Sequence, residues 1–316
     1  MNMDIFATPL SIAVVIPCFN EALAIGQVLQ EFQRELPQAT LHVFDNNSTD
    51  GTANVAAAHG ADVVHVQLRG KGNVVRRMFA DVEADVYIMV DGDATYDISS
   101  IREHVALLVQ KKLDMVVGSR QDSGDNPLTY RPGHRWGNRL LTGSVSRIFG
   151  GQFTDMLSGY RIFSRRYVKS FPAIAKGFEI ETELTVHALG LRMPHAEVPT
   201  IYLSRPEGSH SKLSTYRDGW RILKTILKLF ISERPLAFFA LIAAVLATFS
   251  IGLAIPLAIT YMHTGLVPRL PTAVLVTGSM LSALLSLVCG AVLDTVTRGR
   301  LETKHLAYLS IPASRG

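Results

Sequence analysis

Short apolar runs alternate with longer, one-sided apolar segments from residue 10 to residue 203. The runs are rich in Val and Ile, as buried strands are, whereas the longer segments repeat apolar residues at the spacing of amphipathic helices. Five strands are predicted, at 11–16, 40–44, 62–66, 85–90 and 114–117. Four helices are predicted between them, at 22–36, 51–59, 71–82 and 99–111. This order predicts an α/β fold, with an open, mainly parallel sheet and helices on both faces.

Two long segments near the C-terminus carry no charged residue. The first spans 235–262 and the second 270–293. Each exceeds the ~20 residues that cross the hydrocarbon core of a membrane. Buried helices of soluble proteins rarely extend so far without a charge. We therefore expect a two-helix transmembrane anchor over 235–294, followed by a C-terminal tail over 295–316.

The position of the charged residues decides between two readings of the composition. The 316 residues carry a net charge of +4 and a sequence pI of about 9.1, which is also typical of nucleic-acid-binding proteins. Residues 1–203, however, have a net charge of −3, whereas 204–234 have +4 and 295–316 have +3. Because the basic residues flank the anchor, no nucleic acid is expected as a partner. The positive-inside rule then places both termini and the N-terminal domain in the cytoplasm, on the inner membrane.

The segment at 214–234 predicts an amphipathic juxtamembrane helix. Four basic residues fall on one side of it, and apolar residues cover the remainder. They are Arg217, Arg221, Lys224 and Lys228. A helix of this kind is typical of a membrane interface with anionic lipid. A solvated helix face gives the same pattern, but continuity with the first apolar segment favours the membrane.

Charged residues follow the predicted strands at their carboxyl ends, where ligands bind in open α/β sheets. Three strand ends deliver carboxylates and two deliver cations. The carboxylates are Glu21, Asp45, Asp91 and Asp93, and the cations include Lys71 and Arg120. We therefore expect a binding site at this edge. Lys71 lies between two glycines and is expected to contact a phosphate.

The Asp91-Gly92-Asp93 unit is the most informative of these ends. Two carboxylates that follow an apolar strand suit a hard divalent cation, Mg²⁺ or Mn²⁺. A D-x-D pair is also common in turns, so its weight comes from the other charged strand ends beside it. We expect the metal to hold a diphosphate and neutralise it as it leaves.

The motifs VVIPCFNE, DNNSTDGT, GKGN, DGD, GSR and TDMLSGYR together resemble family 2 glycosyltransferases of the GT-A fold, over about residues 10–215. SRPEGSHSK and the two apolar segments narrow the resemblance to polyprenyl-phosphate glycosyltransferases, the group that includes dolichyl-phosphate mannose synthase. The resemblance implies a Rossmann-like GT-A domain over 1–213. It also implies inverting transfer of a glycosyl unit from a nucleoside diphosphate sugar to a polyprenyl phosphate lipid at the cytoplasmic membrane face.

The resemblance further implies roles for individual residues. Those that would bind the sugar nucleotide are Pro17, Phe19, Glu21, Asp45, Asp91, Arg205 and Lys212. The metal would be held by Asp91 and Asp93. Those that would face the acceptor phosphate are Arg120, Arg131, Arg135 and Ser211. Asp155 in TDMLSGYR and Asp93 are the candidate catalytic residues.

Two assignments stay open at this point. Mannose synthases often continue as D-x-D-L-Q, with the Gln helping to bind metal, whereas Thr95 or Asp97 would have to replace it here. This departure favours a UDP-sugar over GDP-mannose. Asp155 is the family's candidate base, yet a phosphomonoester with a second pKa near ~6 is mostly a dianion at neutral pH. Asp155 is therefore either a base or a residue that positions the acceptor.

Two other functions compete with this interpretation. A processive polysaccharide synthase would carry Q-x-x-R-W, but Gly133-His134-Arg135-Trp136 lacks the Gln. A catalytically inert sugar-nucleotide-binding membrane scaffold would be free to lose the three candidate aspartates, which are present. Two spans in a small enzyme also invite self-association as a homo-oligomer.

Overall fold

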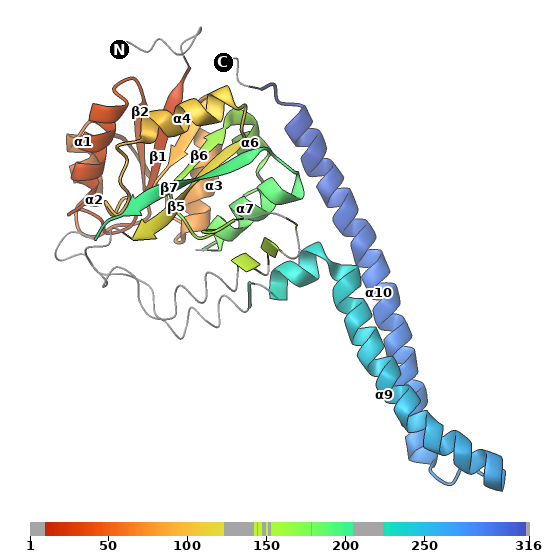
Figure 1. Ribbon diagram of the computed structural model, residues 1–316. Helices are drawn as coiled ribbons and strands as arrows, with labels where there is room; N and C mark the ends of the chain where they lie inside the picture. The colour runs from red at the N-terminus through yellow and green to blue at the C-terminus, as the bar shows by residue number, and fades with distance from the viewer. Residues whose placement is uncertain are drawn as a thin grey trace. The chain divides into compact units, whose positions relative to one another are not determined.

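Within the described residues, seven strands form one sheet in the order β3-β2-β1-β4-β6-β5-β7 (Figure 1). The structure is a computed structural model and describes residues 10–122, 142–143, 145–146, 150, 153–177, 179–204, 224–225 and 227–313. The strands are β1 (Ile12–Cys18), β2 (Thr40–Asp45), β3 (Asp62–His65), β4 (Val86–Met89), β5 (Met115–Asp122), β6 (Arg161–Ser164) and β7 (His195–Tyr202). The helices are α1 (Ile25–Glu35), α2 (Thr52–Ala58), α3 (Lys71–Asp81), α4 (Ile101–Gln110), α6 (Arg165–Ser170), α7 (Ile180–Gly190), α9 (Pro235–Thr264) and α10 (Leu270–Leu309).

The sheet is mainly parallel, as predicted, with β6 as its one reversed strand among the described residues. β1 pairs in parallel with β2 and β4, and β5 pairs in parallel with β7. β6 runs antiparallel to both β4 and β5. β5 ends at the carboxyl edge, and β6, which is antiparallel to it, starts from that same edge. The open α/β fold predicted from the alternation of strands and helices is confirmed.

Different helices cover the two faces of the sheet (Figure 1). On one face, Phe32 of α1 belongs to the same buried apolar cluster as Val14 of β1. On the other, Phe79 of α3 makes edge-to-face contacts with Tyr87 of β4 and Phe163 of β6. Burying each such aromatic ring stabilises the fold by about 1.5–3 kcal/mol. Both faces are therefore closed by apolar packing.

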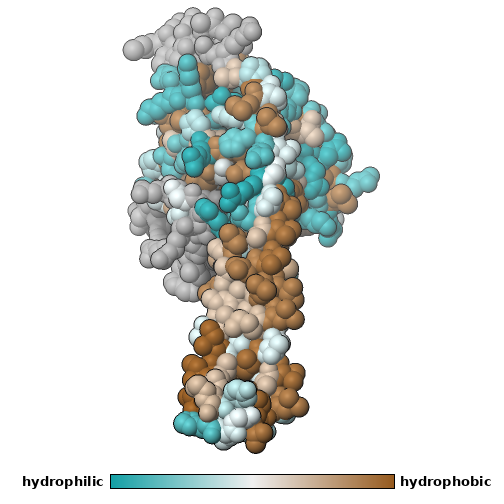
Figure 2. Space-filling view, turned by 90° about the vertical axis from the view of Figure 1, so that its right-hand side faces the viewer, coloured by the Kyte–Doolittle hydropathy of each residue, from teal (hydrophilic) through white to brown (hydrophobic). Residues whose placement is uncertain are grey.

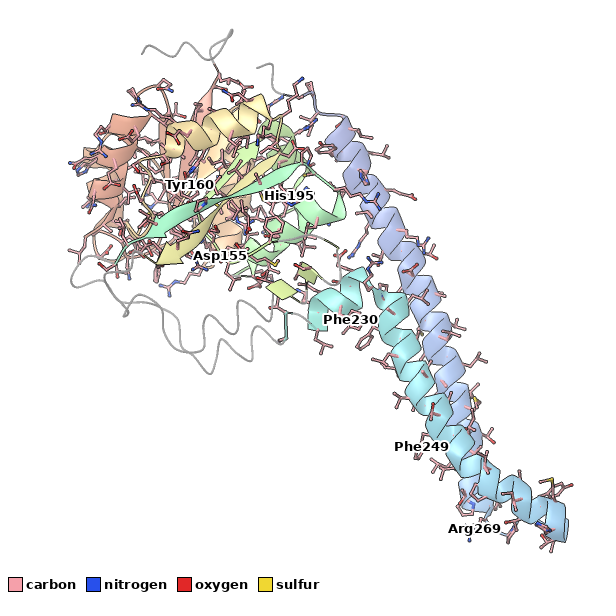
Figure 3. All side chains as sticks on the ribbon, viewed as in Figure 1. Asp155, Tyr160, His195, Phe230, Phe249 and Arg269 are labelled. Carbon is pink, nitrogen blue, oxygen red and sulfur yellow. The ribbon has the colours of Figure 1, made fainter. Side chains whose placement is uncertain are left out.

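Residues 224–303 form a unit of their own, which contains α9 and most of α10. Both helices are long and apolar enough to cross a membrane, with mean hydropathy of 2.5 and 2.0 over their most apolar stretches. Figure 2 shows apolar side chains over both helices, and Figure 3 labels Phe249 on one of them and Arg269 in the turn between them.

Small residues lie where α9 and α10 meet. The Ser250 hydroxyl donates to the Val276 carbonyl at 2.8 Å. A Cβ added to Gly290 would lie 2.9 Å from the Cβ of Phe239, so the glycine permits close approach. Small residues and interhelical hydrogen bonds of this kind also join helices within membranes.

The last residues of α10 belong to the α/β unit, which comprises residues 1–223 and 304–316. The apolar run ends at Leu293, but the helix continues to Leu309, so most of the expected tail is helical. The Tyr308 hydroxyl donates to the Asp114 carboxylate at 2.7 Å, and its ring lies 4.8 Å from the Arg166 guanidinium carbon. These contacts attach the end of α10 to the start of β5.

Candidate active site

The carboxyl ends of β1 and β2 lie side by side, because Pro17 pairs with Phe44 and Cys18 pairs with Asp45. Asp45 is buried, and its Oδ2 accepts from the Ser48 N–H at 3.3 Å. Its Oδ1 is buried without a hydrogen-bond partner among the described residues. A buried carboxylate oxygen in this condition is costly, and a ligand N–H would satisfy it.

Two other predicted nucleotide-binding residues follow β1 at the same edge. The guanidinium carbon of Arg69 lies 5.6 Å from the centre of the Phe19 ring. The backbone of Glu21 forms the turn that leads into α1, since its carbonyl accepts from the N–H groups of Ala24 and Ile25. Its own N–H donates to the Thr52 hydroxyl at 2.9 Å. The region that is predicted to bind the nucleotide base is thus held by hydrogen bonds at the N-terminal ends of α1 and α2.

The Asp91-Gly92-Asp93 unit follows β4 directly. A Cβ added to Gly92 would lie 2.6 Å from the Cys18 sulfur, so the close approach to β1 requires glycine. Asp93 is buried, and its Oδ1 accepts from the Thr95 hydroxyl at 2.6 Å. The turn that carries the two carboxylates is therefore packed directly against the end of β1.

Lys71, the first residue of α3, lies between two carboxylates. Its Nζ is 2.5 Å from Asp91 Oδ1 and 2.6 Å from Glu181 Oε1. Burial alone would lower the pKa of Lys71, but the charges of Asp91 and Glu181 outweigh it and raise that pKa. Burial raises the pKa of Glu181 against the opposing effect of Lys71. The lysine is therefore a fixed cation, and Glu181 is a member of this cluster that the sequence did not assign.

The turn before α3 explains how Lys71 reaches this position. Gly70 has a φ of 119°, and an added Cβ there would lie 2.2 Å from the Lys176 carbonyl oxygen. The Gly70 N–H donates to the Asn46 side chain at 2.7 Å. Glycine is required both for the left-handed backbone and for the close packing. The turn therefore packs against the segment that precedes α7, and α7 carries Glu181.

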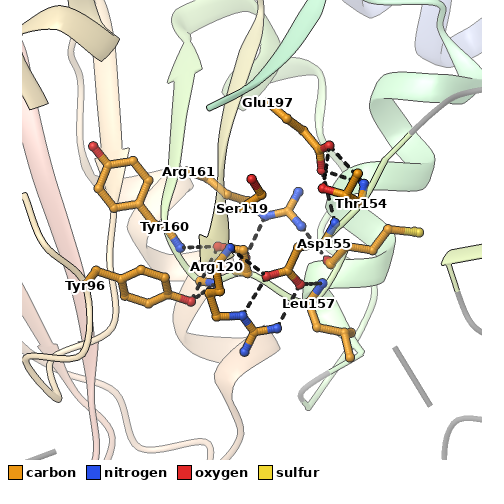
Figure 4. A network of polar contacts seen from close by, with 12 residues as sticks. Tyr96, Ser119, Arg120, Thr154, Asp155, Leu157, Tyr160, Arg161 and Glu197 are labelled. Atoms are coloured by element: carbon orange, nitrogen blue, oxygen red, sulfur yellow. Dashed lines mark hydrogen bonds and ion pairs between the residues drawn. The ribbon is translucent and has the colours of Figure 1, made fainter. Parts of the chain in front are cut away.

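Asp155 and Arg120 form a second cluster (Figure 4). Arg120 of β5 donates from Nε to Oδ2 at 2.6 Å and from Nη2 to Oδ1 at 2.8 Å, and its backbone N–H reaches Oδ2 at 3.2 Å. Asp155 is 4% exposed. The Arg120 guanidinium also lies over the Tyr202 ring, 5.5 Å from its centre. Both carboxylate oxygens are engaged by one guanidinium.

Gly159 and Tyr96 join the two clusters. A Cβ added to Gly159 would lie 2.2 Å from Asp91 Oδ2, so this glycine rests directly against the Asp91 carboxylate. The Gly159 N–H donates to the Tyr96 hydroxyl at 2.9 Å. Gly159 is four residues along the same loop from Asp155. The Asp91 cluster and the Asp155 cluster therefore share one edge of the sheet.

The donor set at Asp91 and Asp93 fits a hard divalent cation, since both offer carboxylate oxygens across one glycine. Among the described residues, no group of three or more His, Cys, Asp or Glu side chains is arranged to hold a metal. The remaining ligands would have to come from a diphosphate or water. Thr95 is hydrogen-bonded to Asp93, and Asp97 accepts from the Ser99 N–H at 2.9 Å. The third ligand stays a prediction.

Five of the predicted site residues lie outside the described residues. They are Arg131, Arg135, Arg205, Ser211 and Lys212. Their expected roles toward the diphosphate and the acceptor phosphate stay predictions. Arg217 and Arg221 of the expected juxtamembrane helix also lie outside the described residues. Lys224 and Lys228 of that segment are described, and both are helical.

Known proteins are similar to this chain in both sequence and fold. A model of glycosyl transferase family 2 matches residues 13–171. The glycosyltransferase AglJ of Haloferax volcanii is 33% identical over 258 residues, which cover 79% of this chain and 82% of AglJ. The dolichyl-phosphate hexose transferase of the same organism is 26% identical over 71% of this chain and 95% of its own length. An uncharacterised protein of Shigella flexneri is 59% identical over 49% of this chain and 95% of its own length.

Among solved structures, glucosyl-3-phosphoglycerate synthase of Mycobacterium tuberculosis aligns with a TM-score of 0.56 and 25% identity. The match covers 69% of this chain and 80% of that one. Another structure of that enzyme, in complex with Mn²⁺ and UDP-glucose, has a TM-score of 0.52, is 25% identical, and covers 70% of this chain and 78% of that one. The GT-A fold expected from the sequence motifs is confirmed.

Proposed function

This chain belongs to glycosyl transferase family 2, and we propose that it transfers a glycosyl unit from a nucleoside diphosphate sugar to a polyprenyl phosphate. A UDP-sugar is the favoured donor, with GDP-mannose as the alternative. The observation that carries this proposal is the contact of Gly159 with the Asp91 carboxylate. It joins a carboxylate pair suited to a metal-bound diphosphate to an arginine–aspartate pair suited to a second phosphate.

The donor side of the proposed site consists of Asp91, Asp93 and Lys71. Asp91 and Asp93 would hold Mg²⁺ or Mn²⁺, which when bound supplies charge neutralisation to the departing diphosphate. Lys71 adds a fixed cation beside them, 2.5 Å from Asp91. The structure of the M. tuberculosis enzyme in complex with Mn²⁺ and UDP-glucose supports a divalent metal and a UDP-sugar as the molecules bound here. Asp45, whose Oδ1 needs a donor, would bind an N–H of the base.

The acceptor side consists of Arg120 and Asp155. The Arg120 guanidinium is a delocalised cation of a kind that suits a phosphate, and its bidentate bond to Asp155 fixes the plane of the group. The relative named as a dolichyl-phosphate hexose transferase, together with the two apolar helices, supports a polyprenyl phosphate as the acceptor. We place the catalytic unit on the cytoplasmic side of the inner membrane. The basic residues lie on the outer flanks of the two apolar helices, and such residues favour the cytoplasmic side.

The reaction is a single displacement. An acceptor phosphate oxygen attacks the anomeric carbon, and the bond from that carbon to the diphosphate oxygen breaks. The electron pair leaves with the nucleoside diphosphate. Because the attack comes from the side opposite the leaving group, the anomeric configuration inverts. The acceptor dianion is already nucleophilic at neutral pH. Asp155 therefore acts by orienting Arg120 and the acceptor, because a role as base would first require the pair with Arg120 to open.

A fractionation experiment tests this function. Membranes from cells with and without the chain receive labelled UDP-glucose, UDP-N-acetylglucosamine or GDP-mannose, with and without EDTA. We expect label in organic-extractable lipid that depends on the chain and is lost with EDTA. Label in polymer would instead support a processive synthase. No label from any donor, with the chain folded and present in the membranes, would support an inert scaffold.

A further inference from the structure

Glu197 of β7 holds the backbone of the loop that carries Asp155. The Thr154 N–H lies 2.9 Å from both Glu197 carboxylate oxygens, and the Thr154 hydroxyl donates to Oε2 at 2.9 Å. The Asp155 N–H donates to Oε1 at 3.1 Å. Figure 4 shows Asp155 between Glu197 and Arg120. One carboxylate thus receives the donors of two consecutive loop residues.

The neighbouring residue on the same face of β7 holds the residue before them. Successive strand residues point to opposite faces, so His195 and Glu197 share a face. The His195 ring stacks on Phe153, with centroids 4.7 Å apart and an interplanar angle of 15°. One face of β7 therefore fixes Phe153, Thr154 and Asp155 in turn. Figure 3 shows His195 and Asp155 in the same part of the α/β unit.

The strand that bears Glu197 is bonded to the strand that bears Arg120. β7 pairs in parallel with β5, with Val117 opposite Glu197 and Arg120 opposite Thr200. The backbone N–H of Asp155 is thus held by Glu197 of β7, and its carboxylate is held by Arg120 of β5. A change that removes the carboxylate oxygens of Glu197 is therefore expected to shift Asp155 relative to Arg120, because those oxygens accept from Thr154 and Asp155.

The other end of the loop has a separate attachment. Buried Arg161 donates from Nη2 to the Met156 carbonyl at 2.6 Å and from Nε to the Ser158 carbonyl at 3.0 Å. These bonds, and the bond from Gly159 to Tyr96, do not involve Glu197. Loss of Glu197 therefore removes the backbone hydrogen bonds of Thr154 and Asp155, while the second part of the loop keeps its own hydrogen bonds.

From these contacts we propose that Glu197 is a positioning residue for acceptor transfer. It acts through the backbone of Thr154 and Asp155 and sets where the Asp155–Arg120 pair receives the acceptor phosphate. This inference rests on the proposed function and adds to it a residue on β7 that none of the sequence motifs includes. It predicts an effect on the acceptor and none on the donor.

The test compares three variants of the full chain in detergent, with a short-chain polyprenyl phosphate as acceptor. Glu197→Ala removes the acceptors for both N–H groups. Glu197→Gln keeps one carbonyl oxygen for those N–H groups and can donate to the Thr154 hydroxyl. Asp85→Ala is the matched control, because the Asp85 carboxylate likewise accepts the N–H and hydroxyl of one residue, Ser11, at 3.0 and 2.8 Å, beside the start of β1.

In Glu197→Ala, a displacement of the loop by about 1 Å is expected to lower kcat/KM for the acceptor by about 10- to 100-fold. In Glu197→Gln the loss should stay within about threefold, because the hydrogen bonds are largely kept. Nucleotide affinity should match wild type in both. Amide hydrogen exchange at Thr154 and Asp155 should accelerate in Glu197→Ala alone. Asp85→Ala should lose comparable thermal stability with wild-type acceptor kinetics.

Two results would overturn the inference. One is wild-type acceptor kinetics in Glu197→Ala. The other is an equal loss of donor binding and acceptor kinetics in Glu197→Ala and Asp85→Ala, which would make Glu197 a residue of general stability. Failure of the proposed function is a different result, because the wild-type chain would then form no glycosyl lipid. Amide hydrogen exchange reports on the backbone of Thr154 and Asp155 even if the chain has no catalytic activity.

Discussion

Arg120 binds both carboxylate oxygens of Asp155, through Nε at 2.6 Å and Nη2 at 2.8 Å. The pair is largely buried, with the two side chains 17% and 6% exposed. Charge-assisted, bidentate bonds of this kind are strong and fix the orientation of both groups. Asp155 is therefore held as a partner of a cation, and its main contribution to the proposed reaction is orientation.

Arg120→Lys should lose acceptor transfer while donor binding stays at the wild-type level. A lysine keeps the charge but cannot make two parallel bonds to Asp155, so kcat/KM for the acceptor should fall about 100-fold. Steady-state kinetics with the acceptor varied, together with a nucleotide binding isotherm, measure the two effects. Arg166→Lys is the matched control, because Arg166 makes an equivalent bidentate pair with buried Asp114. Equal kinetic losses in the two variants would contradict the acceptor role.

Asp155→Asn should abolish turnover and leave nucleotide binding intact. The amide keeps the shape of the side chain but loses the charge and one of the two acceptor atoms that Arg120 uses. Product formation and nucleotide affinity are measured on the same preparation. Near-full turnover in this variant would remove both the base role and the positioning role.

Gly159→Ala should impair metal-dependent donor binding. The added Cβ would lie 2.2 Å from Asp91 Oδ2, within a loop that Tyr96 and Arg161 hold in place. The clash displaces the Asp91 carboxylate, which would raise the Mn²⁺ concentration needed for nucleotide binding by about 10-fold or more. Gly299→Ala is the control, because its Cβ meets no atom within 4 Å. A wild-type Mn²⁺ dependence in Gly159→Ala would refute the contact.

Lys71→Met should destabilise the α/β unit, more so at higher pH. Removing one partner of a buried ion pair costs about 3–5 kcal/mol. The pKa of Glu181 is already raised by burial and rises further without Lys71. The folded state then holds a proton that the unfolded state releases above about pH 4.5, so stability falls as pH rises toward the folded pKa.

Thermal unfolding of Lys71→Met in EDTA, at about pH 5 and about pH 8, measures this dependence. Lys71→Met with Glu181→Gln is the control, since a neutral amide at position 181 carries no titratable proton. The double variant should show a smaller difference between the two pH values. An equal difference in the single and double variants would mean that Glu181 does not titrate in this way.

The hydrogen bond between Tyr308 and Asp114, within the α/β unit, gives a further prediction. Tyr308→Phe removes the hydrogen bond to buried Asp114, which should cost about 1 kcal/mol. Limited proteolysis should then cut the C-terminal segment faster, while the kinetic constants of the isolated reaction in detergent stay unchanged. Tyr261→Phe is the control, because Tyr261 is 56% exposed on α9. Equal proteolysis rates in both variants would argue against the attachment.

The strands that the sequence predicts are short runs rich in β-branched and apolar residues, and β1 and β4 show this pattern most clearly. β1 and β4 are continuous runs that are buried on both faces, and such a pattern depends on local sequence alone. β6 and β7 were not predicted. β6 begins with Arg161, whose guanidinium is completely buried, and β7 contains Glu197 and Pro199. The proline is tolerated because β7 lies at the edge of the sheet.

The site was predictable where it follows strand ends and was not where it depends on distant contacts. Asp91, Lys71 and Arg120 were identified because each follows a predicted strand. Glu181 lies 110 positions after Lys71, and only the packing of the Gly70 turn against the segment before α7 brings the two together. The alternating glutamates Glu179, Glu181 and Glu183 are compatible both with an acceptor pocket and with a solvated edge, so the sequence alone did not single out Glu181.

Product analysis with the purified chain tests the central claim most directly. The chain in detergent receives Mn²⁺, a short-chain polyprenyl phosphate and each nucleoside diphosphate sugar in turn, and mass spectrometry follows the lipid. The account predicts one donor that yields a lipid heavier by one glycosyl unit, with one nucleoside diphosphate released per product and no product from Asp93→Asn. Release of nucleotide without a change in the lipid, or equal product from Asp93→Asn, would contradict it.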